Sequence, residues 1–454
     1  MHTGPARGMR DFLPEDVRRR QYVIDVVRRV YERYGFEPLE TPALENIETL
    51  TGKYGEEGNQ LIYKVLRRGE GASTGETDLA LRYDLTVPLA RVVADNRGKL
   101  PKFFKRYQIQ PVWRADRPAR GRFREFYQCD VDAIGSTSPV VEVEMIAAVS
   151  EVLQALGFKD FTVQLNHRAL LTAMLDAAGV EAAKHADALI AIDKLDKIGH
   201  EKVKEDLVAR GIQRRAADAC LSAFEDLNAF DAMVRKSELG ASASANVAAI
   251  MTLADATPAA GHVKFTPRLA RGLSYYTGAI MEIAVEGIGS LGGGGRYDGL
   301  IGMFSGEQIP ACGFSLGLER ILVVMGERAM FSADVDKSGP DVLVTIFDEM
   351  TIDESLRLAS ELRGGGLRVE VYPETLRSGK DLGKAFKYAD TRQARFVAVL
   401  GAEEVNLGKV KIKNLSTGEQ QAVPRASVVS ALAHRPSAIG HRPSDIVDRP
   451  SDSE

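Results

Sequence analysis

Apolar residues recur at helical spacing near the start of the chain. Between Asp16 and Tyr34, valines and tyrosines share one helical face, arginines take most of the other positions, and Gly35 follows as a cap. This pattern predicts an amphipathic helix. The two prolines in the next segment, Glu37 to Pro42, predict an extended conformation.

Residues 101–135 have the pattern of a β-hairpin. Two runs rich in aromatic and branched residues, 103–113 and 123–134, flank a turn that contains Pro118 and Gly121. One face of the second strand would carry Arg124, Phe126, Gln128, Asp130 and Asp132, because side chains alternate along a strand. Such a face is unusual for a core, and it favours a polar pocket for an anion and an ammonium or imidazole group.

Two further segments of the chain have distinct patterns of predicted secondary structure. Residues 167–262 are alanine-rich, helical in pattern and free of strand signals, which predicts a helical insertion within a catalytic domain of residues 1–330. A linker, 331–339, is followed by alternating strands and helices over 340–432, which predict an α/β domain with a mainly parallel sheet. Thr351 and Glu354 have the spacing of a capping box there. Residues 433–454 contain proline, serine and charged residues without an apolar face, and this composition predicts a disordered tail.

Composition narrows the class of protein. A chain of 454 residues with 44% hydrophobic and 27% charged residues is not disordered throughout, and its length favours several domains. No apolar run has the length of a membrane-spanning helix, so no membrane partner is expected. The three distant cysteines and the scattered histidines argue against a disulfide framework and a His-ligated metal centre, and they favour a reducing cytoplasm.

Charge is distributed unevenly. The net charge is −4, yet residues 101–124 contain eight basic side chains and one acidic side chain, Asp116. A solvated loop is one interpretation. The other is a site for a polyphosphate or a nucleic acid, because guanidinium groups bind phosphate oxygens bidentately.

Three further motifs carry candidate chemistry. Arg271 to Gly278 places an arginine beside a glycine and two tyrosines, and Gly292 to Asp298 begins with four glycines that permit close approach of the backbone. Gly313 to Arg320 leads into a helix expected to start near Ser315. Any one of these motifs is more often structural than functional, but together they favour a site.

These motifs, in this order, resemble those of the histidyl-tRNA synthetases, a class II aminoacyl-tRNA ligase family, along about residues 4–432. Residues 7–14 are similar to the family's N-terminal signature, and residues 37–42, 104–135 and 313–320 to the three class motifs. Residues 271–276 are similar to the signature specific to the histidine enzymes, with Ser274 where the family usually has Asp. The resemblance implies an α+β fold, with a class II catalytic domain of antiparallel sheet and helical insertion, plus a C-terminal α/β anticodon-binding domain.

The resemblance also implies roles for single residues. The histidine-binding residues would be Asp84, Leu85, Thr86, Arg114, Gln128, Asp132, Arg271, Tyr275 and Tyr276. The ATP-binding residues would be Arg114, Arg122, Phe123 and Arg320. Arg271 and Arg114 would be catalytic, because fixed cations stabilise the charge that develops at the α-phosphate. No protein metal ligand is expected, since Mg²⁺ would bridge the outer phosphates of ATP.

The implied activity is the ATP-dependent joining of L-histidine to tRNA(His) by a cytoplasmic homodimer, with residues 37–42 at the dimer interface. The insertion would hold the acceptor arm of the tRNA, and residues 340–432 would read the anticodon. Nine basic against five acidic residues within 379–425 agree with phosphate contacts, although a solvated face would have the same count. Two alternatives remain: a histidine-sensing regulatory relative without ligase activity, and an ATP-dependent ligase of another substrate.

Overall fold

The computed structural model describes residues 3–69, 71–270, 275–336, 339–376 and 378–432. The chain divides into two compact units, residues 1–330 and 331–454. Each unit has its own sheet and its own buried core, so each is described by itself.

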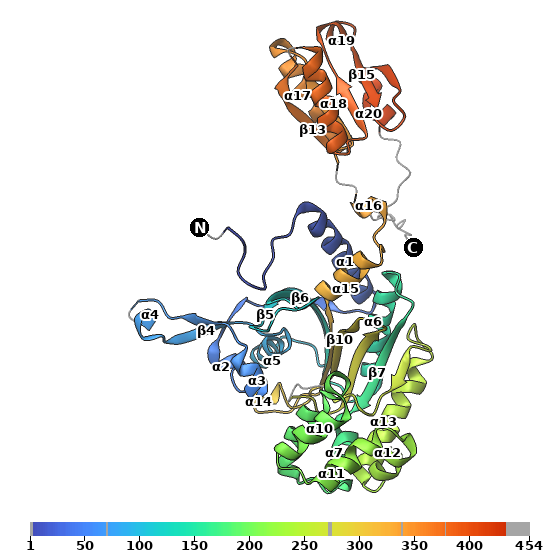
Figure 1. Ribbon diagram of the computed structural model, residues 1–454. Coiled ribbons are helices and arrows are strands. Elements are labelled where there is room, and N and C mark those ends of the chain that lie inside the picture. The colour runs from blue at the N-terminus through green and yellow to red at the C-terminus, as the bar shows by residue number, and fades with distance from the viewer. Residues whose placement is uncertain (1–2, 70, 271–274, 337–338, 377, 433–454) are drawn as a thin grey trace, which may run out of the picture. The chain divides into compact units, whose positions relative to one another are not determined.

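An eight-stranded sheet forms the centre of the first unit, in the order β1-β5-β6-β11-β10-β9-β7-β8 (Figure 1). Its strands are β1 (Glu37–Pro38), β5 (Phe104–Trp113), β6 (Glu125–Ile134), β7 (Phe161–His167), β8 (Val263–Phe265), β9 (Ala279–Val285), β10 (Gly289–Arg296) and β11 (Ala311–Gly317). The five inner pairings are antiparallel, whereas the outermost pairs β1–β5 and β7–β8 are parallel. The predicted α+β fold with an antiparallel catalytic sheet is confirmed.

Three helices pack together against the sheet: α1 (Pro14–Arg33), α6 (Val140–Ala155) and α15 (Leu318–Glu327). The apolar face of α1 is buried, and Tyr31 in it has no exposed surface. The helix starts at Pro14, because proline fits the first turn, where no helical N–H bond is lost. Gly35, with φ +74°, follows its end.

The expected helix start near Ser315 is wrong. Ser315 lies inside β11, where it pairs with Asp130 of β6 and Gly293 of β10. A backbone paired with strands on both sides cannot turn into a helix at that point, so α15 starts at Leu318. Arg320 therefore lies in the first turn of α15.

A small three-stranded sheet, not foreseen from the sequence, extends from the first unit (Figure 1). It contains β2 (Leu44–Asn46), β3 (Lys64–Leu66) and β4 (Thr77–Leu81), with α4 (Gly71–Thr74) at its tip. The next helix, α5 (Thr86–Asp95), follows β4 after a short turn. This turn brings Asp84 to the side of the large sheet.

Helices alone fill the predicted insertion between β7 and β8. They are α7 (Arg168–Ala177), α8 (His185–Ile192), α9 (Leu195–Ile198), α10 (His200–Ala209), α11 (Arg214–Ala223), α12 (Leu227–Val234) and α13 (Glu238–Ala254), with a 3₁₀ turn at Ala182–Lys184. They gather into one bundle, green to yellow in Figure 1. The first unit also has α2 (Ile47–Leu50), α3 (Gly55–Gln60) and α14 (Gly302–Ser305).

The second unit begins with α16 (Ala333–Asp336) and contains a five-stranded sheet, in the order β13-β12-β14-β15-β16. Its strands are β12 (Val342–Ile346), β13 (Val369–Thr375), β14 (Phe396–Val399), β15 (Lys409–Asn414) and β16 (Gln420–Pro424). Three strands are parallel, as expected, but the hairpin β15–β16 adds two antiparallel pairings. The sheet is therefore mixed, and the prediction of a mainly parallel sheet is wrong.

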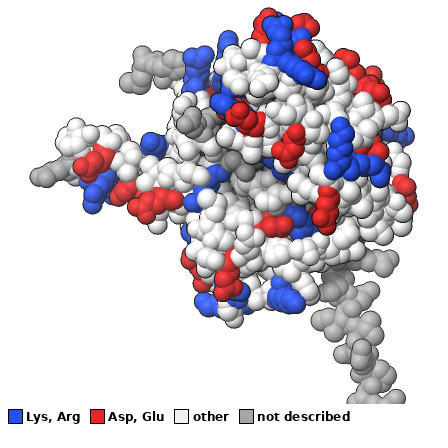
Figure 2. All heavy atoms as spheres, turned by 90° about the horizontal axis from the view of Figure 1, so that it is seen from below, with Lys and Arg blue, Asp and Glu red and all other residues white. Residues whose placement is uncertain are grey.

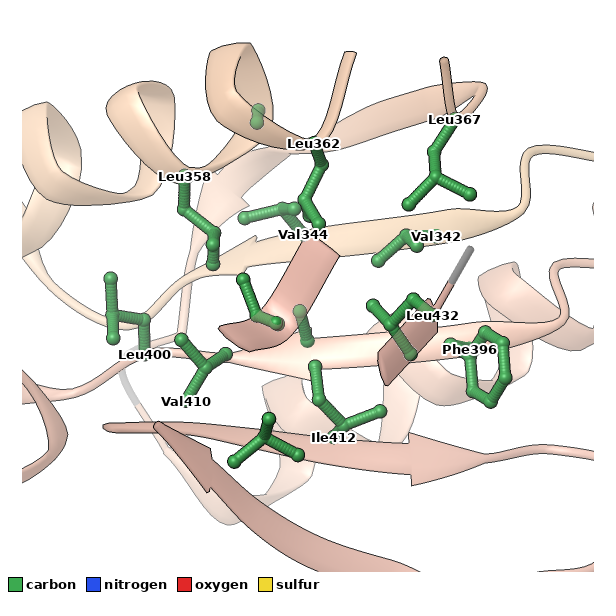
Figure 3. Packing of buried hydrophobic residues seen from close by; sticks show 14 residues of the cluster. Val342, Val344, Leu358, Leu362, Leu367, Phe396, Leu400, Val410, Ile412 and Leu432 are labelled. Carbon is green, nitrogen blue, oxygen red and sulfur yellow. The ribbon is translucent and has the colours of Figure 1, made fainter. Parts of the chain in front are cut away.

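Helices cover both faces of this second sheet. Leu358 and Leu362 of α17 (Ile352–Gly364) point onto Val342 and Val344, and α20 (Val428–Leu432) adds Leu432 to the same core (Figure 3). On the other face, α18 (Gly379–Thr391) packs Ala385 and Ala389 against the sheet. The short α19 (Ala402–Asn406) lies between β14 and β15.

The capping box expected for Thr351 and Glu354 is wrong by one turn. Asp348 and Thr351 cap each other instead, at the start of the 3₁₀ turn Glu349–Thr351, with the Thr351 N–H donating to Asp348 Oδ1 at 2.9 Å. The 3₁₀ turn precedes α17, so the first unsatisfied N–H groups lie earlier than the helical pattern indicated. The predicted tail, 433–454, lies outside the described residues.

Candidate active site

A cavity of about 820 Å³ lies in the first unit, against β6, β10 and β11. Segments far apart in the sequence line it: the start of α5, the hairpin between β5 and β6, the glycine-rich β10, and the start of α15. The helical insertion also contributes a wall, which consists of residues 192–193 and 195–197. One of these residues, Asp196, pairs with Arg268 of the sheet unit at 3.0 Å.

β6 supplies the floor of the cavity. Gln128, Asp130 and Asp132 line it from alternate positions of the strand, and all three are at least 90% buried. Each has one buried oxygen with no hydrogen-bond partner: Gln128 Oε1, Asp130 Oδ1 and Asp132 Oδ2. Three unsatisfied acceptors in one cavity favour a ligand with several N–H donors, because an unpaired buried polar atom is costly.

Asp132 is held by residues beneath and beside it. Arg106 of β5, which has no exposed surface, places Nη2 2.8 Å from Asp132 Oδ2, close enough for an ion pair but not aligned for a hydrogen bond. Tyr297 donates a hydrogen bond to Oδ1. Burial, the largest cause, raises the pKa of Asp132, and Arg106 and Tyr297 oppose that shift.

Asp84 is the second buried carboxylate of the site. Its Oδ1 accepts hydrogen bonds from the Tyr54 hydroxyl at 2.9 Å and the Val87 N–H at 3.0 Å, and its Oδ2 accepts one from the Tyr275 hydroxyl at 3.3 Å. Burial raises the pKa of Asp84, and these donors together with the charge of Arg114 oppose the shift. The rings of Tyr275 and Tyr276 pack edge to face, with centroids 5.1 Å apart.

The basic side of the cavity is formed by the hairpin turn and α15. Arg114 donates from Nε to the Tyr83 carbonyl at 2.9 Å, and its guanidinium lies over the Tyr83 ring at 4.3 Å. Arg122, Phe123 and Arg320 line the same cavity. Behind Phe123, the guanidinium carbon of Arg10 lies 3.4 Å from the ring centroid.

The glycine run of β10 makes the strands approach one another closely. A Cβ on Gly294 would lie 2.0 Å from the Gly313 carbonyl oxygen, and one on Gly313 would lie 1.8 Å from Asp132 Oδ1. Neither position has space for a side chain. Arg296, at the end of the run, points away from the cavity's lining residues and forms a bidentate ion pair with Glu142, at 2.6 and 2.8 Å.

The structure brings most of the candidate residues together. Asp84, Thr86, Arg114, Arg122, Phe123, Gln128, Asp132, Tyr275, Tyr276 and Arg320 all line the cavity. Leu85 is not among the lining residues: its side chain is fully buried, and its carbonyl accepts a hydrogen bond from Arg106 at 3.1 Å. Arg271 and Ser274 lie outside the described residues.

Two members of the basic cluster have other roles. Arg124 lies outside the lining residues, where its Nε donates to the Asp116 carbonyl at 3.1 Å. Arg106 is buried beneath Asp132 rather than exposed to an anion. Period-two alternation placed Arg124 on the cavity face, but it precedes β6, which begins at Glu125.

Sequence reasoning missed Tyr54, Tyr297 and Glu319. Glu319 is 3% exposed and accepts two hydrogen bonds from the Tyr127 N–H, at 3.0 and 3.1 Å. Burial raises the pKa of Glu319 to about 7. Tyr297 and Glu319 lie within the motifs of residues 292–298 and 313–320, where they were given no role, whereas Tyr54 has no sequence signal.

The described surface mixes the two signs of charge. On the face shown in Figure 2, lysine and arginine side chains are interspersed with aspartate and glutamate around a central hollow. None of the helices in the described ranges is long and apolar enough to cross a membrane. The described residues also contain no group of three or more His, Cys, Asp or Glu side chains able to hold a metal ion.

Comparisons with known proteins give the family. The family model described as Histidyl-tRNA synthetase matches residues 8–321, and the one described as Anticodon binding domain matches residues 341–435. The chain belongs to the histidyl-tRNA synthetase family.

Full-length relatives agree with this assignment. The chain is 41% identical to a protein named Histidine--tRNA ligase from Gloeobacter violaceus, over 95% of this chain and 98% of that one. It is 40% identical to the protein of the same name from Cytophaga hutchinsonii, over 94% and 98%. A crystal structure of histidyl-tRNA synthetase from a Nostoc species superposes with a TM-score of 0.76 at 30% identity, covering 95% of this chain and 99% of that chain.

Proposed function

We propose that the protein is a histidine–tRNA ligase. It activates L-histidine with ATP to histidyl-adenylate, releasing diphosphate, and transfers the histidyl group to the 3′ end of tRNA(His), releasing AMP. Family membership supports the reaction. The observation that carries the choice of amino acid is the row of three buried acceptors without hydrogen-bond partners on β6, in a cavity that is also lined by two tyrosine rings.

The acceptors match the donors of histidine. Its ammonium group carries three N–H donors and its ring carries one or two. We assign the ammonium group to Asp84 and Thr86, and the ring to Gln128, Asp132, Tyr275 and Tyr276. A site built to hydrogen-bond a substrate rejects analogues that lack those groups by large factors.

The cations of the cavity support the activation step. The histidine carboxylate attacks the α-phosphorus of ATP, and negative charge develops on the phosphate oxygens. Arg114 and Arg271 would stabilise that charge, while Arg122 and Arg320 would bind the outer phosphates. Phe123 would stack on adenine with the face that Arg10 leaves open.

Mg²⁺ would arrive bound to the outer phosphates of ATP. The described residues fit this role better than that of a resident metal site, because they contain no group of three or more His, Cys, Asp or Glu side chains able to hold a metal ion. The protein's own contribution is then to bind and orient the nucleotide.

The remaining parts would serve the tRNA and the assembly. We assign the acceptor arm to the helical insertion 167–262, the anticodon to residues 340–432, and a homodimer interface to residues 37–42. The linker 331–339 would join the two domains. The three cysteines are buried free thiols, which suits a reducing cytoplasm.

Exchange of labelled pyrophosphate into ATP tests the proposal. The exchange should require histidine and should not occur with any other common amino acid. A histidine-sensing relative would bind histidine without exchange, and a ligase of another substrate would exchange with a different amino acid. Either result would overturn the proposal.

A further inference from the structure

Asp130 is a buried carboxylate of the cavity that is not among the residues assigned to the ammonium group or the ring of histidine. It lies between Gln128 and Asp132 on the cavity face of β6 and is 2% exposed. Its Oδ1 has no hydrogen-bond partner. Arg106 Nη2 lies 4.0 Å from Asp130 Oδ2, against 2.8 Å from Asp132 Oδ2.

We propose that Asp130 is a further substrate-binding residue, whose free Oδ1 accepts a hydrogen bond from an imidazole N–H of the bound histidine. This inference rests on the proposed function. It names the residue that makes the site prefer a ring with a proton to donate.

The sum of the charges around Asp130 supports a contact with the imidazole ring. Asp84, Asp130 and Asp132 together bring three negative charges, and Arg106 is the fully buried cation that faces two of them. The ammonium group of the substrate supplies a second positive charge, beside Asp84, and the charge of Arg114, which also acts on Asp84, offsets that of the substrate carboxylate. One negative charge remains, and it is balanced when Asp130 and the imidazole ring hold one proton between them.

The surroundings of Asp130 agree with a shared proton. Arg106 faces it from β5, Ser315 from β11, Asp132 along β6, and Asp84 across the cavity, with the Tyr31 hydroxyl of α1 behind the sheet. Burial is the largest cause that raises the pKa of Asp130 to about 7; the charge of Arg106 and a hydrogen bond from Ser315 oppose it, and the charges of Asp132 and Asp84 add to it. The ordinary pKa of a histidine ring, about 6.5, is close to this value.

The absence of a strong partner separates this role from a structural one. If a carboxylate stabilises the fold, the protein becomes less stable when that carboxylate is neutralised. A buried carboxylate without a close cation lowers the stability of the protein, so its neutralisation has the opposite effect. Asp130→Asn keeps the shape of the side chain and removes the charge. We expect this variant to be at least as heat-stable as the wild type in the absence of ligand, and to bind histidine poorly.

Calorimetric titration with L-histidine, without ATP, tests the proposal. Asp130→Asn should raise the dissociation constant of histidine about 10- to 100-fold, the range for a hydrogen bond to a charged group. The KM for ATP in pyrophosphate exchange should stay within about twofold, because the outer cavity is untouched. Glu142→Gln removes a buried carboxylate outside the cavity and should lower Tm without changing histidine affinity.

Two further measurements assign the contact to the ring. A triazole analogue of histidine has the same ammonium and carboxylate groups but a far less basic ring, so Asp130→Asn should cost it less than it costs histidine. For the wild type, the dissociation constant of histidine should rise between about pH 7 and 8, as both partners lose the shared proton, and Asp130→Asn should lack this rise.

Each outcome is decisive. Wild-type histidine affinity in Asp130→Asn, or a lowered Tm of that variant, would overturn the inference and leave the proposed function standing. Equal losses for histidine and the triazole analogue would place Asp130 at the ammonium group and overturn the assignment to the ring. A wild-type protein that does not bind histidine would overturn both proposals.

Discussion

Asp84 and Tyr275 are 191 positions apart in the chain, and the Tyr275 hydroxyl donates a hydrogen bond of 3.3 Å to Asp84 Oδ2. Tyr54 donates to the other oxygen of the same carboxylate, at 2.9 Å. Asp84 is thereby fixed between two phenols from different parts of the chain. Only Tyr275 of the two also lines the cavity.

Tyr275→Phe should raise the KM for histidine about three- to tenfold with little change in the KM for ATP. The variant removes one neutral hydrogen bond, worth roughly 1 kcal/mol, from a carboxylate assigned to the substrate ammonium group. Tyr54→Phe is the matched control, because it removes the donor on the side away from the cavity. It should lower Tm and leave the KM for histidine within about twofold; the reverse order of effects would contradict the assignment.

Arg114→Ala should lower the rate of histidine-dependent pyrophosphate exchange by about 10²–10³-fold without loss of fold. The guanidinium group is anchored by its Nε on the Tyr83 carbonyl, which directs the rest of the fork. Arg114→Lys keeps the charge but not the fork, so it should recover only part of the rate. Full activity in the lysine variant would show that a point charge suffices.

Glu142→Gln should lower the free energy of unfolding by about 3–5 kcal/mol, because it leaves Arg296 buried with an incomplete partner. The ion pair lies outside the cavity, so KM values at low temperature should not change. Asp160→Asn is the control: it breaks a partly exposed ion pair with Arg328 and should cost about 1 kcal/mol or less. Chemical denaturation of the three proteins compares these costs.

His167 should make the protein sensitive to acid. Its Nδ1 accepts the Ala169 N–H at the start of α7, and burial, with a smaller contribution from Arg296, lowers the pKa of the ring to about 4. An unfolded histidine titrates near pH 6.5, so the unfolded state binds more protons between pH 6.5 and 4 and stability falls as pH decreases. His167→Asn retains a cap and should show a smaller drop of Tm over this range. An equal drop would contradict the assignment.

A chain truncated near Ser338 should retain histidine activation but charge tRNA poorly. The residues assigned to histidine and ATP all lie within residues 84–320, and the first unit has its own sheet and core. What is lost is the tRNA contact area of the second unit, and contacts to phosphates weaken with salt. Pyrophosphate exchange and aminoacylation, measured in parallel, separate the two steps. Loss of exchange in a folded truncated chain would show that the second unit supports the active site.

The elements that the sequence predicted well depend on local patterns. The helix of residues 14–33 has a continuous apolar stripe, and the strands of residues 104–134 carry aromatic and branched residues around a Pro/Gly turn. The three-stranded sheet of β2, β3 and β4 was not predicted, because strands of three to five residues with exposed faces have no clear alternation. Ser315 was misplaced because an apolar run next to a helix reads as part of that helix.

The same contrast holds for the site. Gln128, Asp130 and Asp132 share a face because side chains alternate along a strand, and this could be read without a structure. The residues that contact the buried carboxylates could not be predicted from this alternation. Arg106 lies on the neighbouring strand and appeared to belong to an anion-binding cluster, and Tyr54 reaches Asp84 through tertiary folding alone.

The glycines of β10 and β11 bear on any attempt to change the amino acid that the cavity accepts. At Gly294 and Gly313 the wall itself is main chain, and a Cβ there would lie 2.0 Å from the Gly313 carbonyl oxygen or 1.8 Å from Asp132 Oδ1. Main chain has no rotamers and cannot be trimmed by mutation, so this part of the boundary is fixed in position. Redesign toward a larger amino acid would have to act on Tyr275, Tyr276 and Gln128, which line the cavity with side chains that can be shortened.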